Sequence, residues 1–270
     1  MEYRERSPHP ALRPFVDRFW VSAAEADPGP RRVLPDGCID LLIDLHRGAR
    51  AVVVGTMTRA AVFDPRAPVR TVAVRFRPGG AGPFLRVPAN ELTDRVVTFV
   101  EIGLPWLEPE RLVGFADLDQ AAIAFEQSLL HRLRAIGSPD LLVTHAVAIL
   151  LRPMSPSVEH LSRELGCTRQ HLRRAFKQHV GIGPKQLARV ARMQRAVDVL
   201  GRGRGGIAAT ALDLGYFDQA HMSRDLRDLA GVTARVARAS AGSIFTIRSL
   251  YGEAYLAREK AHSEPHRVEH

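Results

Sequence analysis

The chain has 270 residues, of which 46% are hydrophobic, and this supplies enough apolar material for two ordinary domains or one large one. Two cysteines, Cys38 and Cys167, are too few for a disulfide framework and fit a cytoplasmic protein. The polar, charged first ten residues do not have the pattern of a signal peptide, and no apolar run of about 18 residues predicts a membrane span.

Residues 1–110 are rich in proline, glycine and β-branched residues. Three runs in this part have strand composition, namely residues 37–45, 51–57 and 69–76. We therefore expect a small, mostly antiparallel β domain.

Four side chains of this β domain could line an effector pocket: Trp20, Arg59, Arg75 and Arg77. Arg75 and Arg77 share a face if their strand is regular, which would suit an anionic ligand. Ordinary surface salt bridges are the alternative interpretation. No metal site and no cofactor are expected.

Cys38 lies in a Pro-Asp-Gly-Cys-Ile-Asp stretch and could be a sensing or alkyl-accepting thiol, since exposed thiols of low pKa react. A cysteine inside a strand is more often a buried small hydrophobe. The neighbouring carboxylates of Asp36 and Asp40 are not accompanied by a catalytic set, so turn and strand-edge roles are expected for them.

Residues 111–152 form a helical linker with two apolar helices, expected over residues 117–135 and 140–151. The apolar stripe of the first helix could be core or a dimer contact. The protein could therefore be a monomer or a homodimer.

Residues 153–240 carry the excess charge. Residues 152–240 hold 16 lysines and arginines against seven acidic residues, a net charge of +9 that equals the formal net charge of the whole chain. Such a concentration of positive charge is typical of a surface that binds a polyanion.

Two similar helical units follow one another in this region. In the first, Ser157 and Thr168 can cap two short helices joined at Gly166, and Gly181 ends the second. In the second unit, residues 207–215 form the first helix and Asp218 caps the second, which Gly231 ends. A helix from residue 184 to residue 200 joins the units. The pattern predicts two helix-turn-helix units, with recognition helices at residues 168–180 and 218–230.

Residues 157–238 resemble the DNA-binding domain of the AraC/XylS family of bacterial transcription regulators. The stretches LSRELGCTRQHLRRAFKQHVGIGP and ALDLGYFDQAHMSRDLRDLAGVT carry the resemblance. It implies an all-α fold of seven helices and binding of double-stranded DNA in two successive major grooves. It further implies base contacts from Gln170, Arg173 and Arg174 in the first unit and from Gln219, Ala220 and Arg224 in the second. Phosphate contacts are expected from Ser157, Thr168, Arg169, Lys177, Ser223 and Arg227.

Three positions depart from the family pattern. Ala234 replaces a usual proline, and Met222 and Leu226 stand where phenylalanine is usual. Ala220 has a short side chain at a base-reading position, so the second unit is expected to read fewer bases.

The N-terminal half resembles a domain that precedes this DNA-binding unit in many actinobacterial regulators. The stretches SPHPALRPFV, VLPDGCIDLLI, VRFRPGGAGPFL and ELTDRVV carry that resemblance. It implies effector sensing or dimerisation, on a cupin-like barrel or a sandwich. The whole chain is then a two-domain α+β protein, with an extension over residues 241–270 whose last residues are expected to fray.

The sequence thus favours a one-component, sequence-specific transcription regulator that is not an enzyme. RNA polymerase and a small-molecule effector are possible partners, and a membrane is not. Two alternatives remain open: a DNA-targeted protein that accepts an alkyl group on Cys38, and an architectural DNA-binding protein with little sequence preference.

Overall fold

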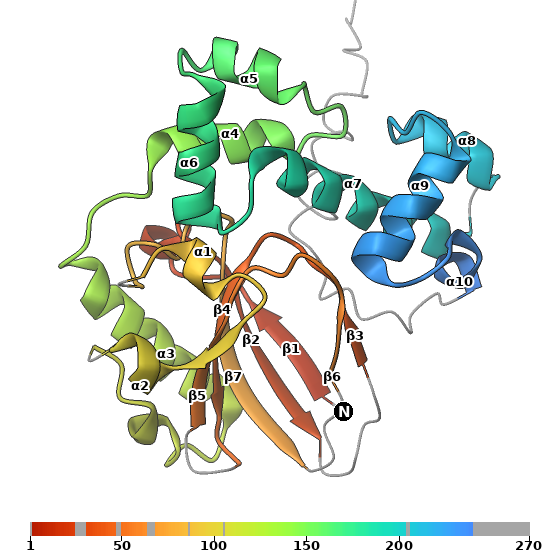
Figure 1. Cartoon of the computed structure of the whole chain (residues 1–270). Coiled ribbons are helices and arrows are strands. Elements are labelled where there is room, and N and C mark those ends of the chain that lie inside the picture. Colours follow the sequence, from red (N-terminus) through yellow and green to blue (C-terminus); the bar gives the residue numbers. More distant parts are fainter. Residues whose placement is uncertain are drawn as a thin grey trace, which may run out of the picture.

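A computed structural model of the whole chain describes residues 2–24, 31–46, 50–63, 68–85, 87–104, 106–203 and 206–239. Strands make up the N-terminal part and helices the C-terminal part (Figure 1). This confirms the two-part α+β architecture. The expected extension, residues 241–270, lies outside the described residues.

The N-terminal part contains a six-stranded antiparallel sheet in the order β1-β2-β7-β4-β5-β8 and a two-stranded sheet of β3 and β6. The strands are β1 (Glu2–Arg6), β2 (Val16–Ala24), β3 (Arg31–Val33), β4 (Ile39–Asp44), β5 (Arg50–Val54), β6 (Ala61–Phe63), β7 (Val69–Phe76) and β8 (Val96–Thr98). The antiparallel β domain is confirmed. Its larger sheet is open, with β1 and β8 at the edges, so the described strands do not close into a barrel.

Alternation along the central strands gives the larger sheet its two faces. Leu41 and Ile43 of β4, together with Val74 of β7, are fully buried in the first hydrophobic core. The neighbouring residues Asp40 and Arg75 point to the opposite face and are also buried. One face of the sheet is therefore apolar and the other carries buried charges.

Short helices surround the sheet, and longer helices follow it in the chain. The short ones are α1 (Ala89–Leu92), α2 (Phe99–Ile102) and the 3₁₀ turns Pro10–Leu12 and Pro109–Leu112. The longer part comprises α3 (Leu118–Leu133), α4 (Leu141–Leu150), α5 (Val158–Glu164), α6 (Arg169–Val180), α7 (Pro184–Gly201), α8 (Ile207–Asp213), α9 (Gln219–Asp225) and α10 (Ala234–Ala239).

The two helices of the expected linker, residues 111–152, belong to different cores. The apolar stripe of α3, including Phe125 and Leu129, is buried against β2 and β7 in the first core. Val143, Ala146 and Leu150 of α4 are buried in a second core that also contains α5 to α10. The apolar stripe of α3, which was expected to be core or a dimer contact, is thus part of the core of this chain. Counting α4, the second core has the seven helices that the sequence resemblance implied, all of them among the described residues.

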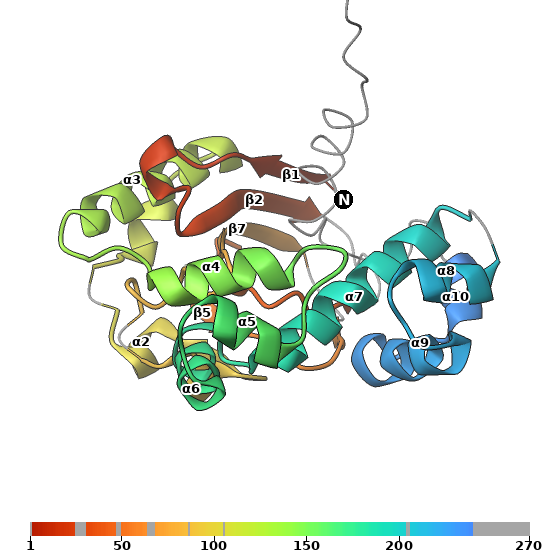
Figure 2. The same cartoon turned by 90° about the horizontal axis from the view of Figure 1, so that it is seen from above.

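The helix α7 runs through the middle of this helical part (Figure 2). One of its ends packs with α4 and α6, and the other packs with α8, α9 and α10 (Figure 1). The two expected helix-turn-helix units therefore sit at opposite ends of a single 18-residue helix.

Candidate DNA-binding surface

The first helix-turn-helix unit consists of α5 and α6. The hydroxyl of Ser157 accepts a hydrogen bond from the backbone N–H of His160 at 3.2 Å, and that of Thr168 accepts one from the N–H of His171 at 3.1 Å. Both helices therefore start at capped residues, as expected. Gly166, with φ +63°, makes the turn between them in a conformation that favours glycine.

The α6 helix has one apolar and one basic face. Leu172, Phe176 and Val180 are buried in the second core. The opposite face is exposed and carries the side chains of Arg169, Gln170, Arg173, Arg174 and Lys177. None of these four cations forms an ion pair with a described acidic residue. They are free to pair with charges outside the chain.

The second unit consists of α8 and α9. The Asp218 carboxylate accepts a hydrogen bond from the His221 N–H at 2.6 Å and caps α9. Met222 and Leu226 are fully buried, so the two departures from phenylalanine fill core positions of this unit. From Leu226 to Ala230 the recognition helix continues as a π-helix. It ends at Gly231, whose φ is +64°.

The exposed face of α9 is less basic than that of α6. The sequence-predicted residues on it are Gln219, Ala220, Ser223, Arg224 and Arg227, of which Ser223 is half-buried and the others are exposed. The Arg227 guanidinium donates to the backbone carbonyl of Ser223 at 3.2 Å. Arg224 is thus the only cation on this face, among the described residues, without a hydrogen bond inside the chain.

Arginines of α7 hold the second unit in place, and the sequence reasoning missed them. The Arg189 guanidinium binds the buried carboxylate of Asp225 at 2.7 Å. The Arg192 guanidinium lies 4.7 Å from the ring centre of Tyr216 and donates to the Gly215 carbonyl at 3.2 Å. Arg189 and Arg192 are three residues apart on an otherwise largely apolar helix, and this spacing was a signal that could have indicated their role.

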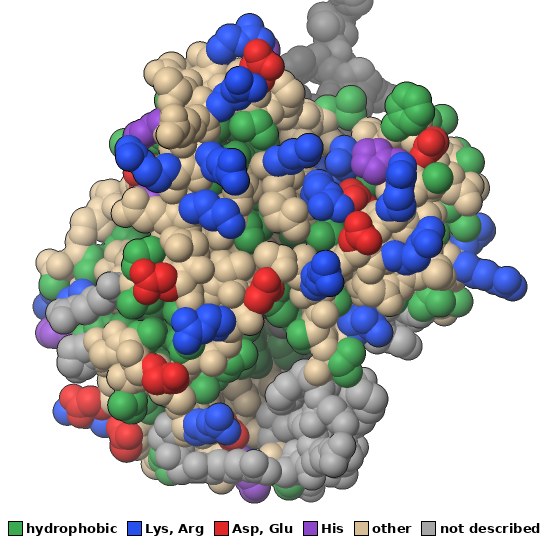
Figure 3. Space-filling view, viewed as in Figure 1, with side chains coloured by type: hydrophobic (Ala, Val, Ile, Leu, Met, Phe, Trp, Pro, Cys, Tyr) green, Lys and Arg blue, Asp and Glu red, His purple; other side chains and the backbone are tan. Residues whose placement is uncertain are grey.

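The two recognition helices lie on the same side of the molecule, with α7 behind them (Figure 2). On this side, lysine and arginine side chains gather over the two helix-turn-helix units (Figure 3). The helices α6 and α9, which carry most of the predicted contact residues, therefore lie on one basic side of the molecule. A rod-shaped polyanion could contact both units at once.

His171 and His221 occupy the same position in the two helix-turn-helix units, and their surroundings differ. The imidazole of His221 packs edge-on against the Tyr216 ring, with 5.2 Å between ring centres, and His171 is exposed. Within the described residues, no group of three or more histidine, cysteine and acidic residues could hold a metal ion. A packing role for His221 agrees with this geometry.

The four candidate effector residues do not converge on one place. Arg59 lies in the segment after β5, beside the second unit, and Arg77 donates to the Arg13 carbonyl at 2.8 Å. Trp20 and Arg75 share the charged face of the larger sheet, since Trp20 pairs with the residue two places before Arg75. The sequence did not show that only Trp20 and Arg75, of these four residues, lie on the same face of the sheet.

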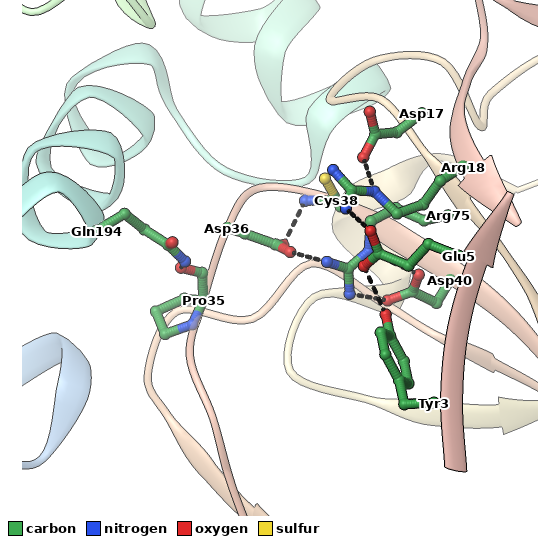
Figure 4. A network of polar contacts seen from close by, with 10 residues as sticks. All are labelled: Tyr3, Glu5, Asp17, Arg18, Pro35, Asp36, Cys38, Asp40, Arg75 and Gln194. Carbon is green, nitrogen blue, oxygen red and sulfur yellow. Dashed lines mark hydrogen bonds and ion pairs between the residues drawn. The ribbon is translucent and has the colours of Figure 1, made fainter. Parts of the chain in front are cut away.

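Arg75 is the centre of a buried ion-pair cluster (Figure 4). Its guanidinium lies 2.8 Å from the carboxylates of both Asp36 and Asp40, and only 2% of the residue is exposed. The positive charge is therefore already compensated inside the chain. A ligand anion at Arg75 would have to displace one of these carboxylates.

Cys38 belongs to the same cluster. The residue is 5% exposed, and its backbone N–H donates to the Asp36 carboxylate at 2.9 Å. Burial, and then the charge of Asp36, raise the pKa of the Cys38 thiol well above its usual value. The reactive thiolate that alkyl transfer needs is disfavoured here.

Comparison with known proteins agrees with the geometry of the helical part. A family model described as a helix-turn-helix domain matches residues 161–240. The C-terminal part is a helix-turn-helix domain of the AraC type. This AraC-type domain provides both recognition helices of the basic face. Residues 4–98 match a second family model, a domain of unknown function (DUF6597).

One curated relative is an uncharacterized HTH-type transcriptional regulator of Haemophilus influenzae. It is 31% identical over 103 residues, which is 37% of this chain and 35% of the relative. The match thus spans about a third of the relative's length.

Two similar solved structures come from Chromobacterium violaceum and Vibrio cholerae. A transcriptional regulator domain from Chromobacterium violaceum is 26% identical, with 37% of this chain and 92% of that chain covered and a TM-score of 0.35. ToxT from Vibrio cholerae is 12% identical, with 89% and 97% covered and a TM-score of 0.41.

No helix in the described part of the chain is both long enough and apolar enough to cross a membrane.

Proposed function

We propose that the chain is a one-component transcription regulator whose AraC-type domain binds a specific DNA site across two successive major grooves. The supporting observation is that α6 and α9 lie on one face, each starting at a capped residue and presenting exposed polar side chains. A recognition helix contacts base edges with its N-terminal residues, and a second helix can enter the next groove about 34 Å away.

The residues that would contact bases are Gln170, Arg173 and Arg174 of α6 and Gln219, Ala220 and Arg224 of α9. Arginine can bind guanine through two parallel hydrogen bonds, and glutamine can bind adenine in the same way. Ser157, Thr168, Arg169, Lys177, Ser223 and Arg227 would contact phosphate. We assign most of the base discrimination to α6, because Ala220 offers α9 only a methyl group.

The test is a selection of binding sites from random DNA with the full chain, followed by a salt series on the selected duplex and a scrambled duplex. We expect a preference of about a thousandfold or more at roughly 0.15 M salt. Arg173→Ala and Arg174→Ala should reduce this preference more than they reduce binding to the scrambled duplex. Arg134→Ala, an exposed arginine at the end of α3, is the matched control. Equal affinity for both duplexes would contradict the proposal and favour an architectural role.

The β domain is proposed to act as a sensor or dimerisation domain of this regulator. The charged sheet face around Trp20 and Arg75 is the candidate place for an effector, because the Trp20 indole N–H is buried there and has no hydrogen-bond partner among the described residues. Thermal-shift screening of anionic and neutral metabolites tests this role. RNA polymerase contact, a homodimer and a cytoplasmic location are parts of the same proposal.

A further inference from the structure

The β domain donates hydrogen bonds to the C-terminal carbonyls of both recognition helices. The Thr56 hydroxyl donates to the carbonyl of Val180, the last residue of α6, at 2.6 Å. The Ala60 backbone N–H donates to the carbonyl of Leu229, near the end of the second recognition helix, at 2.7 Å. Both donors belong to one segment, residues 55–60, which we call the bridge segment. A stretch of six residues therefore touches both DNA-binding units.

The last carbonyls of a helix have no partner inside the helix and carry the negative end of its dipole. They are thus suitable acceptors for such contacts. Thr56 is fully buried, so water does not compete for its hydrogen bond. The bridge segment makes its contacts at the helix ends and leaves the base-reading N-terminal turns of both helices free.

The bridge segment is itself held firmly in the β domain. The N–H and the hydroxyl of Thr58 donate to the two carboxylate oxygens of Asp94, at 2.7 and 2.6 Å. Asp94 has a φ of +57°, a conformation found in no other non-glycine residue of the described ranges. A Cβ on Gly55 would lie 1.8 Å from the carbonyl oxygen of Leu92, so this position tolerates no side chain. Movement of the segment would have to break these contacts.

Three further hydrogen bonds reinforce the same contact. The Thr93 hydroxyl donates to the Gly181 carbonyl at 2.9 Å, directly after α6. The Arg32 guanidinium donates to the Ala230 carbonyl at 3.3 Å. Between the units, the Gln194 side chain of α7 donates to the Pro35 carbonyl at 2.7 Å. The β domain thus holds α7 as well as both recognition helices.

We propose that the bridge segment sets the separation of the two recognition helices, and therefore the spacing of DNA half-sites that the protein accepts. The inference rests on the proposed function. Without the bridge segment and the reinforcing contacts of Arg32, Thr93 and Pro35, α7 alone links the units, and bending of this helix would change their separation. With it, α6, α7, the second recognition helix and the bridge segment form a closed ring. A change of one base pair moves a half-site by about 3.4 Å along the helix axis and rotates it by roughly 34°. Because a rigid ring cannot follow this displacement, the protein should bind a site with altered half-site spacing more weakly.

The experiment varies the spacing between the half-sites of the selected duplex by one base pair in each direction. For the unmodified chain, we expect each change to weaken binding by about tenfold or more, a loss comparable to that of a mismatched base pair. Thr56→Val removes the hydroxyl donor at similar volume and should reduce this penalty to about threefold or less. Thr56→Ser keeps the donor and should restore the penalty. Thr144→Val is the matched control, because within the described part of the chain its hydroxyl donates only to the Asp140 carbonyl, at 2.8 Å, at the start of α4.

A second variant does not depend on the stability of Thr56→Val. One glycine inserted between Arg59 and Ala60 lengthens the bridge segment and removes no donor. It should broaden or shift the preferred spacing. An unchanged spacing preference in both variants, or an equal loss of affinity at every spacing, would overturn the inference and leave α7 as the element that sets the distance. Failure of the unmodified chain to select any sequence would instead overturn the proposed function.

Discussion

At the scale of single residues, the start of the first recognition helix depends on one hydroxyl. Thr168→Ala removes the acceptor for the His171 N–H and should lower the free energy of unfolding by about 1 kcal/mol. Urea unfolding of the full chain measures this loss. Thr168→Ser keeps the hydroxyl and should lose much less. An unchanged stability of Thr168→Ala would show that the cap is not needed to form α6.

A second residue-scale prediction concerns the two thiols. Cys167, half-buried between α5 and α6, should react with a thiol reagent in the folded protein well before Cys38 does. Burial and the raised pKa of Cys38 keep that thiol protonated and covered. Mass spectrometry of digested, labelled protein gives the order of modification. Fast labelling of Cys38, or an adduct on it after incubation with alkylated DNA, would revive the alkyl-accepting alternative.

At the scale of elements, α7 stabilises the second unit through a partly buried ion pair. Arg189→Ala leaves the buried Asp225 carboxylate with the Arg192 guanidinium at 3.9 Å as its nearest remaining cation. Loss of one partner from a fully buried pair costs about 3–5 kcal/mol. Because the Arg189 side chain is 30% exposed, we expect a smaller loss of stability, about 2 kcal/mol.

Arg202→Ala is the matched control for this prediction, since it lies at the end of the same helix. It breaks an exposed pair with Asp198, in which both side chains are about half exposed, and should cost less than about 0.5 kcal/mol. Thermal or urea unfolding compares the two variants. Similar losses for Arg189→Ala and Arg202→Ala would mean that the buried carboxylate finds enough compensation elsewhere.

The elements also show which features a sequence pattern can predict. The boundaries of α6 follow from the capping Thr168 and from Gly181, which ends the helix. The start of α7 follows from Pro184 in its first turn. These predicted boundaries agree with the structure to within one residue. The strand β1 was not predicted, because it is mostly polar and is completed only by pairing with β2. Non-local pairing leaves little trace in a local pattern.

In the candidate site, too, local features could be predicted from the sequence and long-range contacts could not. The predicted contact residues of α6 do lie on its exposed face, since helical periodicity fixes which side chains lie opposite a buried stripe. The ion pairs of Arg75 were not, because Asp36 and Asp40 precede it by 39 and 35 residues and reach it only through the pairing of β4 and β7. The contacts of Thr56 with Val180 span 124 residues and had no sequence signal.

At the scale of the whole molecule, the net charge of +9 lies in the AraC-type domain and should make DNA binding strongly salt-dependent. Arg169→Ala and Lys177→Ala should each reduce the slope of log K against log salt concentration by about 1. They should weaken selected and scrambled duplexes alike, because phosphate contacts carry no sequence information. Arg134→Ala should leave the slope unchanged. A slope unaffected by the α6 variants would place the phosphate contacts on other residues.

The division of the linker helices between two cores determines where the chain can be cut. A C-terminal fragment that starts at residue 153 loses Val143, Ala146 and Leu150, which fill the core beneath α6 and α7. A fragment that starts near Pro139 retains them together with the Asp140 cap of α4. The smallest part of this protein that could be fused to a different sensor and still unfold cooperatively should therefore include α4, although α4 lies outside the matched helix-turn-helix region.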